Sequence, residues 1–305
     1  MDLICLGNIT IDDLVLPDGS VHIGCFGGDA VYAALSAKLW TDSVGLVAPL
    51  GYDCPSTYVN RLKDVGFDLS GLPYRNVPTY RNWVVYDHSG HRTWIPQTAD
   101  HHFFELSPLT VDIPEDYRNA RGFLVLAMDL AAQEDLIGEL SKANGLVALD
   151  PQEDYIAGNE DRVISLIKQV DIFLPSEIEV ERLMGHRDFE RAARDFISFG
   201  CKVVVIKMGS KGALVYESST CKEEYIPVFP VNAVDSTGAG DSFSGGFMAC
   251  FVRTLDVVQS GLCGAVSASF AIEGYGTEHL FSISRSQALE RFEELVKIRN
   301  YFSKA

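Results

Sequence analysis

Short apolar runs alternate with longer amphipathic segments along most of the chain. The short runs are rich in Val, Ile and Leu, which is typical of strands that are buried on both faces. The longer segments repeat their apolar positions with the period of a helix. This alternation predicts a parallel sheet whose right-handed connections are helices. Strands are expected at 3–6, 44–48, 123–126, 146–150, 171–174 and 203–206, and helices at 29–40, 55–65, 131–144, 161–169, 241–254, 257–272 and 285–297.

Two segments follow a different pattern, in which apolar and polar residues alternate with the period of a strand. Residues 14–26 are interrupted by Pro17-Asp18-Gly19 and residues 77–97 by Ser89-Gly90, which are turn formers. Each segment is therefore predicted to be a β-hairpin, and together they are expected to form a small sheet that stands off the main domain. Because the second hairpin is rich in aromatic residues, we expect this sheet to pair with a second subunit in a homodimer.

The composition limits the partners of the protein. Its 305 residues suit one large α/β domain with a small appendage, and 47% of them are hydrophobic. No apolar run is long enough to span a bilayer, and residues 1–7 enter a strand without a basic leader, so we expect a cytoplasmic protein with no membrane partner. A net charge of −17, without a basic patch, argues against a nucleic acid partner. The seven cysteines are scattered and are expected to be reduced.

The chemistry is expected at residues 234–243, which read Val-Asp-Ser-Thr-Gly-Ala-Gly-Asp-Ser-Phe. A β-rich segment precedes them and a helical pattern begins at Asp241, so Gly238, Ala239 and Gly240 are predicted to form a helix N-terminus. The first amides of a helix lack internal partners and can bind an anion such as phosphate. Asp241 then stands where a carboxylate can accept the proton of an attacking hydroxyl. Alternatively, the glycines serve only a tight turn and Asp241 complements the helix dipole.

The run from Asp235 to Asp241 resembles the signature of the PfkB/ribokinase family of sugar and nucleoside kinases. Further family motifs follow the same order over nearly the whole chain. The resemblance implies a ribokinase-like three-layer α/β/α fold with a doubly wound, mostly parallel sheet, in a single domain of residues 1–305. Residues 14–26 and 77–97 correspond to a β-sheet lid over the substrate site. No P-loop, HExxH helix, G-x-S-x-G elbow or paired-cysteine zinc pattern indicates another class of enzyme.

The substrate contacts are expected near the start of the chain. Asp12 follows the first strand, where an open α/β sheet binds its ligand, and it completes the family's Gly-x-x-x-x-Asp pattern from Gly7. Gly27 and Gly28 resemble the family's first glycine pair, whose backbone approaches the substrate closely. Tyr32 stands where many sugar kinases of the family have Asn. It is therefore either a substrate contact or an aromatic residue of the core.

The resemblance also implies where ATP binds. Residues 207–212 read Lys-Met-Gly-Ser-Lys-Gly and resemble the family's nucleotide loop, Thr-x-Gly-x-x-Gly. Lys207 replaces the usual Thr, and it is either a cation that neutralises phosphate charge or a surface lysine at a strand end. Gly209, Ser210 and Gly212 are implied to contact the nucleotide. Gly276 belongs to a later loop, 273–278, around which the family builds its adenine pocket.

Two cations are implied by the same resemblance. Residues 175–179 read Pro-Ser-Glu-Ile-Glu and resemble the family's Pro-Asn-x-x-Glu element, whose glutamate helps to position Mg²⁺ through water. Ser176 replaces Asn, and together with Glu179 it also fits a helix capping box, which by itself explains both residues. Asp235 and carbonyls near Gly276 correspond to the K⁺ site that many members have.

The residues and the resemblance together predict an ATP-dependent kinase that phosphorylates a hydroxyl of a sugar or a similar small polyol. Asp241 is expected to act as the general base, while the amides of 238–240 stabilise the transferred group. One alternative is a nucleoside kinase of the same fold, in which the aromatic residues Tyr80 or Trp83 stack on the base. The other is a non-catalytic relative that senses a sugar.

Overall fold

The parallel strands form one central sheet. The computed structural model describes residues 1–88, 92–99 and 101–302. Within this part of the chain, the strand order is β14-β13-β12-β11-β10-β9-β1-β4, and all neighbours from β12 to β4 are parallel. The antiparallel hairpin β13-β14 completes one edge. The strands are β1 (Leu3–Leu6), β4 (Val44–Val47), β9 (Gly122–Val125), β10 (Leu146–Leu149), β11 (Ile172–Phe173), β12 (Val203–Lys207), β13 (Ala213–Glu217) and β14 (Lys222–Ile226).

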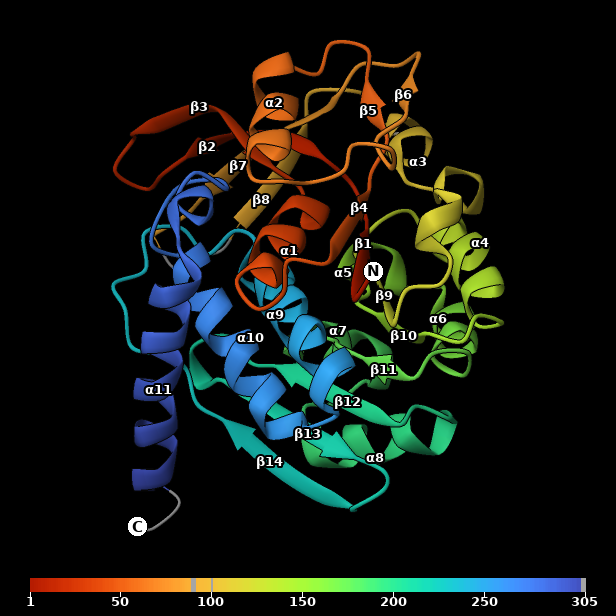
Figure 1. The fold of residues 1–305 in the computed structure, drawn as a ribbon, viewed down its shortest axis with the longest axis vertical. Coiled ribbons are helices and arrows are strands. Elements are labelled where there is room, and N and C mark those ends of the chain that lie inside the picture. The colour runs from red at the N-terminus through yellow and green to blue at the C-terminus, as the bar shows by residue number, and fades with distance from the viewer. Residues whose placement is uncertain (89–91, 100, 303–305) are drawn as a thin grey trace.

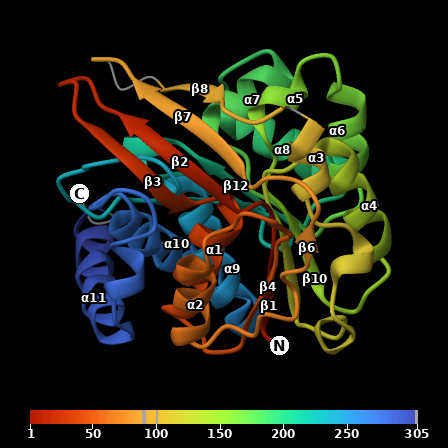
Figure 2. The same cartoon turned by 90° about the horizontal axis from the view of Figure 1, so that it is seen from above.

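Helices cover both faces of this sheet, which confirms the predicted three-layer α/β/α fold (Figures 1 and 2). One layer holds the helices whose apolar residues join the first core cluster. They are α1 (Asp29–Lys38), α2 (Ser56–Asp64), α9 (Ala239–Thr254), α10 (Val257–Ala271) and α11 (Arg285–Phe302). The helices of the other layer pack into the second core cluster. They are α4 (Leu130–Leu140), α5 (Glu153–Ile156), α6 (Glu160–Ile167), α7 (Glu177–Met184) and α8 (Phe189–Phe199).

The apolar runs in the sequence follow from this arrangement. In β1, Leu3 and Cys5 pack into the first cluster, whereas Ile4 and Leu6 pack into the second. All four side chains are fully buried. Successive side chains of a strand point to opposite faces, and both faces are covered by helices, so every position is apolar and no alternation appears in the sequence.

A second, small sheet stands beside the central one, with the order β3-β2-β7-β8. Its strands are β2 (Thr10–Val15), β3 (Val21–Gly27), β7 (Tyr80–Tyr86) and β8 (Arg92–Pro96), and β2 pairs with β7 in parallel. The first strand therefore begins at Thr10 rather than at residue 14. Asp12 lies within this strand and not in a loop after β1. A register shift between Asp12 and Leu14 interrupts the alternation of apolar and polar residues. The start of this strand therefore cannot be recognised from an alternating pattern in the sequence.

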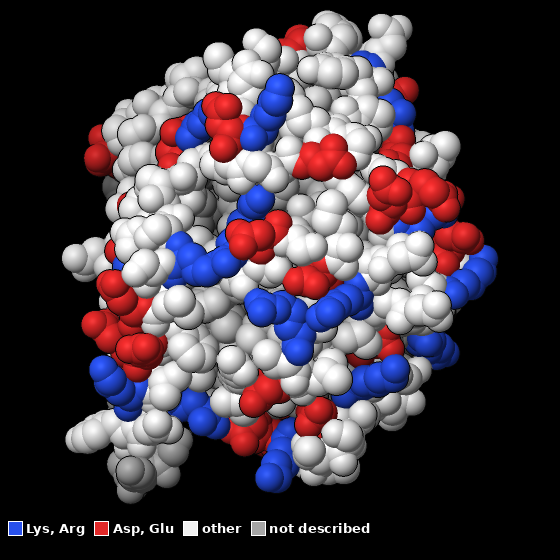
Figure 3. Space-filling model, viewed as in Figure 1, with Lys and Arg blue, Asp and Glu red and all other residues white. Residues whose placement is uncertain are grey.

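The turn predicted at Ser89-Gly90 lies outside the described residues. The remaining elements are short, namely β5 (Leu50–Gly51), β6 (Tyr74–Arg75), α3 (His101–Leu106), and the 3₁₀ turns η1 (Thr110–Asp112), η2 (Glu115–Tyr117), η3 (Gly209–Lys211) and η4 (Leu280–Ser282). None of the helices described combines the length and the apolar character needed to cross a bilayer. On the face seen in Figure 3, acidic and basic side chains are interspersed.

Helix α9 packs unusually close to its two neighbours in the layer. A Cβ at Gly245 would overlap the backbone of Ala33 in α1, and a Cβ at Gly246 would lie 2.9 Å from the carbonyl oxygen of Cys263 in α10. The two glycines therefore allow contact between helix backbones, which fixes the position of α9 against the sheet.

Replacing Gly245 with Ala tests this contact. We expect G245A to lower the free energy of unfolding by about 1–3 kcal/mol, because the added methyl group meets rigid backbone and forces α9 away from α1. Urea denaturation followed by circular dichroism measures the change.

The matched control is G138A in α4, where a Cβ would meet no atom within 4 Å. There the same substitution is expected to raise stability by roughly 0.5–1 kcal/mol through helix propensity. Equal effects of the two substitutions would contradict the close contact.

Candidate active site

A cavity of about 870 Å³ opens between the carboxyl ends of the central strands and the small sheet. This is the edge at which parallel α/β sheets bind ligands. The cavity brings together most of the residues singled out in the sequence, although they are distant along the chain. They are Asp12, Gly28, Tyr32, Glu179, Lys207, Gly209, Ser210, Gly212, Gly238, Ala239, Gly240 and Asp241.

The N-terminus of α9 lies in this cavity, as the glycine-rich motif predicted. Gly238 caps the helix with φ 74° and ψ 2°, a left-handed conformation that favours glycine. A Cβ at Gly238 would also overlap the ring of Tyr32. The amide of Ala239 donates to the carbonyl oxygen of Ser236 at 3.3 Å. The amide of Gly240, one position further on, belongs to the helix turn that can accept an anion.

Tyr32 is a core residue that reaches the wall of the cavity. It is 2% exposed, and its ring packs against the backbone of Gly238. Burial, followed by the charges of Asp235 and Asp12, raises the pKa of its phenol well above the usual value. The hydroxyl is therefore uncharged at neutral pH.

Two carboxylates at the N-termini of α1 and α9 interact electrostatically. Asp241 lies in the first turn of α9, and Asp29 is the first residue of α1. Asp29 accepts a hydrogen bond from the amide of Asn8 at 2.8 Å. Burial and then the charge of Asp241 raise the pKa of Asp29 well above its usual value. The sequence analysis did not single out Asp29, although its place directly after the glycine pair was a signal.

Lys207 forms a buried ion pair with Asp150, the residue that follows β10. Its Nζ lies 2.5 Å from Asp150 Oδ2 and 3.3 Å from Ser244 Oγ. Burial by itself lowers the pKa of Lys207. The carboxylates of Asp150 and Glu179 raise this pKa by more than burial lowers it, so the net shift is upward and the ammonium keeps its charge. Lys207 is thus not a surface lysine. Asp150 was missed by the sequence analysis, and its signal was its position directly after a parallel strand.

Glu179 fulfils the predicted capping box and also faces the cavity. Its carboxylate accepts from the amide of Ser176 at 2.5 Å, and its own amide donates to Ser176 Oγ at 3.3 Å. Burial raises the pKa of Glu179 to about 8, against the lowering effect of the Lys207 charge.

The loop after β12 forms another part of the wall. Gly209 and Gly212 both have positive φ, and a Cβ at Gly212 would overlap the carbonyl oxygen of Ile226. Gly276 lies next to the small sheet, where a Cβ on it would sit 3.0 Å from Cys25 Cβ. It is not among the described residues that line the cavity. The ATP contact implied for Gly276 stays a prediction.

The small sheet contributes a polar end to the cavity. Asp12 is 3% exposed and accepts hydrogen bonds from Asn82 Nδ2 at 3.0 Å and from Thr10 Oγ1 at 2.9 Å. Burial raises its pKa to about 6, against the lowering effect of these two bonds. A Cβ at Gly27 would lie 2.8 Å from Asp12 Oδ2, so glycine leaves room for this carboxylate.

Three aromatic side chains line the cavity near this polar end, namely Tyr80, Trp94 and Phe103. The rings of Tyr80 and Phe103 are 5.2 Å apart. Trp83, which was expected to stack on a base, does not line the cavity, since alternate residues of β7 point to opposite faces. Of the two aromatic residues named in the sequence analysis, Tyr80 lines the cavity, and its contact with a base stays a prediction. The sequence analysis did not single out Asn82, Trp94 or Phe103.

Asp235 lies just behind the wall and not in it. Its Oδ1 accepts hydrogen bonds from the hydroxyl of Tyr86 and, at 2.9 Å, from the amide of Thr237. Its Oδ2 is buried and has no hydrogen-bond partner within the described residues. An unpartnered buried carboxylate oxygen fits a cation ligand, because burial of an uncompensated charge is costly.

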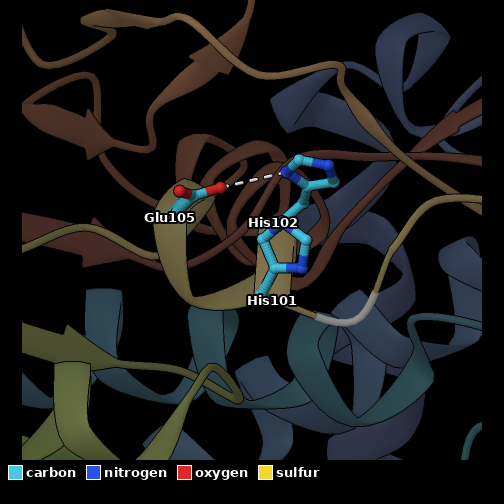
Figure 4. Close-up of side chains that lie close together, drawn as sticks. All are labelled: His101, His102 and Glu105. Carbon is cyan, nitrogen blue, oxygen red and sulfur yellow. Dashed lines mark hydrogen bonds and ion pairs between the residues drawn. The ribbon is translucent and has the colours of Figure 1, made fainter.

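One further group of possible metal ligands lies on α3, outside the predicted sites. His101, His102 and Glu105 have ligand atoms within 4.8 Å of one another (Figure 4). His102 Nδ1 and Glu105 Oε2 are 2.9 Å apart and form a pair at the surface. The neighbouring Phe103 points into the cavity instead.

Comparison with known proteins places this geometry among the kinases. The family model for pfkB family carbohydrate kinases matches residues 21–283. A cytidine kinase of Thermococcus kodakarensis is 32% identical over 260 residues, which cover 83% of this chain and 89% of that protein. A nucleoside kinase of Methanocaldococcus jannaschii is 27% identical, with coverage of 90% and 91%. The structure of a candidate ribokinase II of E. coli, in complex with ATP and Mg²⁺, superposes with a TM-score of 0.79 at 19% identity, over 96% of this chain and 99% of that one.

Proposed function

Because this chain belongs to the pfkB family of carbohydrate kinases, we propose that it transfers the γ-phosphoryl group of ATP to a hydroxyl of a nucleoside. The observation that carries the proposal is the N-terminus of α9, which places Asp241 and the Gly240 amide in one cavity. A cavity of this size suits two ligands of moderate size side by side. ATP is assigned to the end at Gly209, Ser210 and Gly212, and the acceptor to the end at Asp12.

A nucleoside acceptor is favoured over a free sugar by the aromatic end of the cavity. Asp12 and Asn82 offer polar groups for ribose hydroxyls, whereas Tyr80, Trp94 and Phe103 offer apolar surface that a free sugar would leave unfilled. The relatives named as cytidine and nucleoside kinases point the same way. The sugar or polyol acceptor predicted from the sequence is thus the second candidate, supported by the general description of the family.

The proposed reaction is an in-line displacement on the γ-phosphorus. The oxygen of the acceptor hydroxyl forms a bond to phosphorus while its proton passes to the Asp241 carboxylate. The bond from phosphorus to the bridging oxygen breaks, and its electron pair leaves with ADP. The Gly240 amide donates to the transferred group as its charge shifts.

Two cations complete the proposal. Mg²⁺, when bound, neutralises phosphate charge, and Glu179 would hold it through water. The unpartnered Oδ2 of Asp235 fits the K⁺ ligand implied by the family resemblance. Potassium would then bind behind the wall of the cavity, next to the turn that leads into α9.

The D241N variant tests the general base. We expect kcat to fall by about 10²–10⁴-fold, because the amide cannot accept the hydroxyl proton, while the KM for ATP changes little. A coupled ADP assay with acceptor and Mg²⁺ measures both constants. D64N, which removes an equal charge from the exposed end of α2, is the control and should leave kcat unchanged. Turnover of D241N near the wild-type rate would overturn the assignment of Asp241 as the base. Silence of the wild type across all acceptors, with an intact sugar affinity, would favour the sensing alternative.

An acceptor panel with the W94A variant tests the substrate class. We expect kcat/KM to be about 5–150-fold higher for cytidine or another nucleoside than for ribose, because base stacking contributes roughly 1–3 kcal/mol. W94A should lower kcat/KM for the nucleoside and leave that for the free sugar unchanged. Higher turnover on pentoses or hexoses, insensitive to W94A, would instead establish a sugar kinase.

The pH dependence of acceptor use tests Asp12. Its pKa of about 6 means that the carboxylate is ionised above this pH and protonated below it. Since the ionised form accepts hydrogen bonds from acceptor hydroxyls, kcat/KM for the acceptor should rise with pH through about 6 and then level off. In D12N this inflection should vanish and kcat/KM should be low throughout. An unchanged inflection in D12N would assign it to another group.

A further inference from the structure

The charge of the cavity is strongly one-sided. Among the described residues that line it, Lys207 is the one cationic side chain. Eight acidic residues share the same lining, namely Asp12, Asp29, Asp150, Glu153, Asp154, Glu177, Glu179 and Asp241. A polyanion such as ATP meets net repulsion in such a cavity unless cations compensate it. The position of the single lysine is therefore decisive for where phosphate can bind.

Lys207 stands directly beside the N-terminus of α9. A Cβ at Gly240 would lie 3.4 Å from Lys207 Nζ, so the ammonium adjoins the second residue of the helix. An anion that accepts a hydrogen bond from the Gly240 amide is thus within reach of the ammonium as well. Fixed donors of this kind are most effective in a site that excludes water.

Two residues from separate elements, Asp150 and Ser244, hold this ammonium in place. The side chain of Lys207 is 12% exposed, and that of its partner Asp150 is 4% exposed. Ser244, one turn after Gly240 in α9, donates to Asp150 Oδ2 at 2.6 Å and accepts from Lys207 Nζ at 3.3 Å. An ammonium has three donors, and these contacts occupy two of them. Lys202, directly before the start of the same strand β12, differs, since its side chain is 68% exposed and pairs with Asp171 outside the cavity.

We propose that Lys207 is the fixed cation that binds the γ-phosphoryl group of ATP, and that Asp150 and Ser244 are positioning residues that aim it. The inference rests on the proposed kinase reaction and assigns a further catalytic residue to it. Lys207 keeps its proton throughout, because the hydroxyl proton goes to Asp241 and the bridging electron pair leaves with ADP. Its charge acts on the phosphoryl oxygens during transfer, together with the Gly240 amide.

The K207M variant tests the proposal, with K202M as the matched control. We expect K207M to lower kcat by about 10²–10³-fold, as the loss of one oxyanion-hole donor does in other enzymes, and K202M to leave kcat unchanged. The KM for the acceptor should change little in either variant. The binding of a non-hydrolysable ATP analogue and of ADP, measured by calorimetry, gives a second readout. K207M should weaken the analogue at least tenfold and ADP less than threefold, because ADP lacks the γ-phosphate.

The D150N variant and the K207M/D150N pair test the positioning role. D150N should lower kcat less than K207M does, since the ammonium of Lys207 remains but loses the carboxylate that holds it in position. The double variant should be no slower than K207M alone, because residues that act as one unit are not additive. Loss of one partner leaves a buried charge without compensation and lowers the melting temperature, whereas the double variant removes both charges at once. If K207M fails to fold, the double variant therefore carries the test.

The outcomes separate this inference from the proposed reaction. A wild type that phosphorylates an acceptor, with K207M within threefold of its kcat, would overturn the role of Lys207 and leave the kinase intact. A wild type without turnover would overturn the reaction. In that case, a loss of affinity in K207M for the ATP analogue but not for ADP still supports the γ-phosphate contact. An equal loss of affinity for both nucleotides, or no loss for either, overturns this contact.

Discussion

The close packing of α9 between α1 and α10 is the constraint on which the site depends. Gly245 and Gly246 let the backbone of α9 touch its neighbours, so the helix cannot shift without a clash. Its N-terminus is therefore fixed at the edge where the parallel strands end. Gly238 turns the chain into the helix in a conformation that other residues rarely adopt, and Tyr32 supports this turn. The carboxylate of Asp241, the proposed base, and the amide of Gly240, the proposed phosphate donor, are thus placed by packing rather than by a flexible loop.

Several buried carboxylates at the same edge of the sheet have raised pKa values. The upward shifts of the pKa of Asp12, Asp29 and Glu179 all have burial as their largest cause. Such shifts indicate carboxylates that lack enough positive charge in the free protein, and they are common at functional sites. Lys207 compensates part of this charge, because it pairs with Asp150 and its positive charge lowers the pKa of Glu179. Cations that bind together with ATP would compensate more of this negative charge. The electrostatics of the free protein therefore favour the binding of cations in the cavity.

The small sheet links the acceptor end of the cavity to the central motif. Asn82 of β7 bonds to Asp12 of β2 within the sheet, while Tyr86, further along β7, bonds to Asp235 beside the α9 turn. One strand therefore contacts both the proposed acceptor site and the proposed cation site. This arrangement couples the position of the small sheet to the residues that lead into α9.

The sequence by itself determined the main alternation of strands and helices, the start of α9 at the Gly-Ala-Gly run and the family, because these depend on local periodicity and on contiguous residues. It did not give α8 or the hairpin β13-β14. The tertiary structure decided which side chains meet in the cavity. Asp150 is 57 residues from Lys207 and Asp12 is 70 from Asn82, so strand order and register bring these pairs together. The register shift in β2 and the choice of the face of β7 that lines the cavity, which excludes Trp83, are likewise settled by pairing between strands. Contacts of this kind leave no mark in a single sequence, since neither partner constrains its own neighbours.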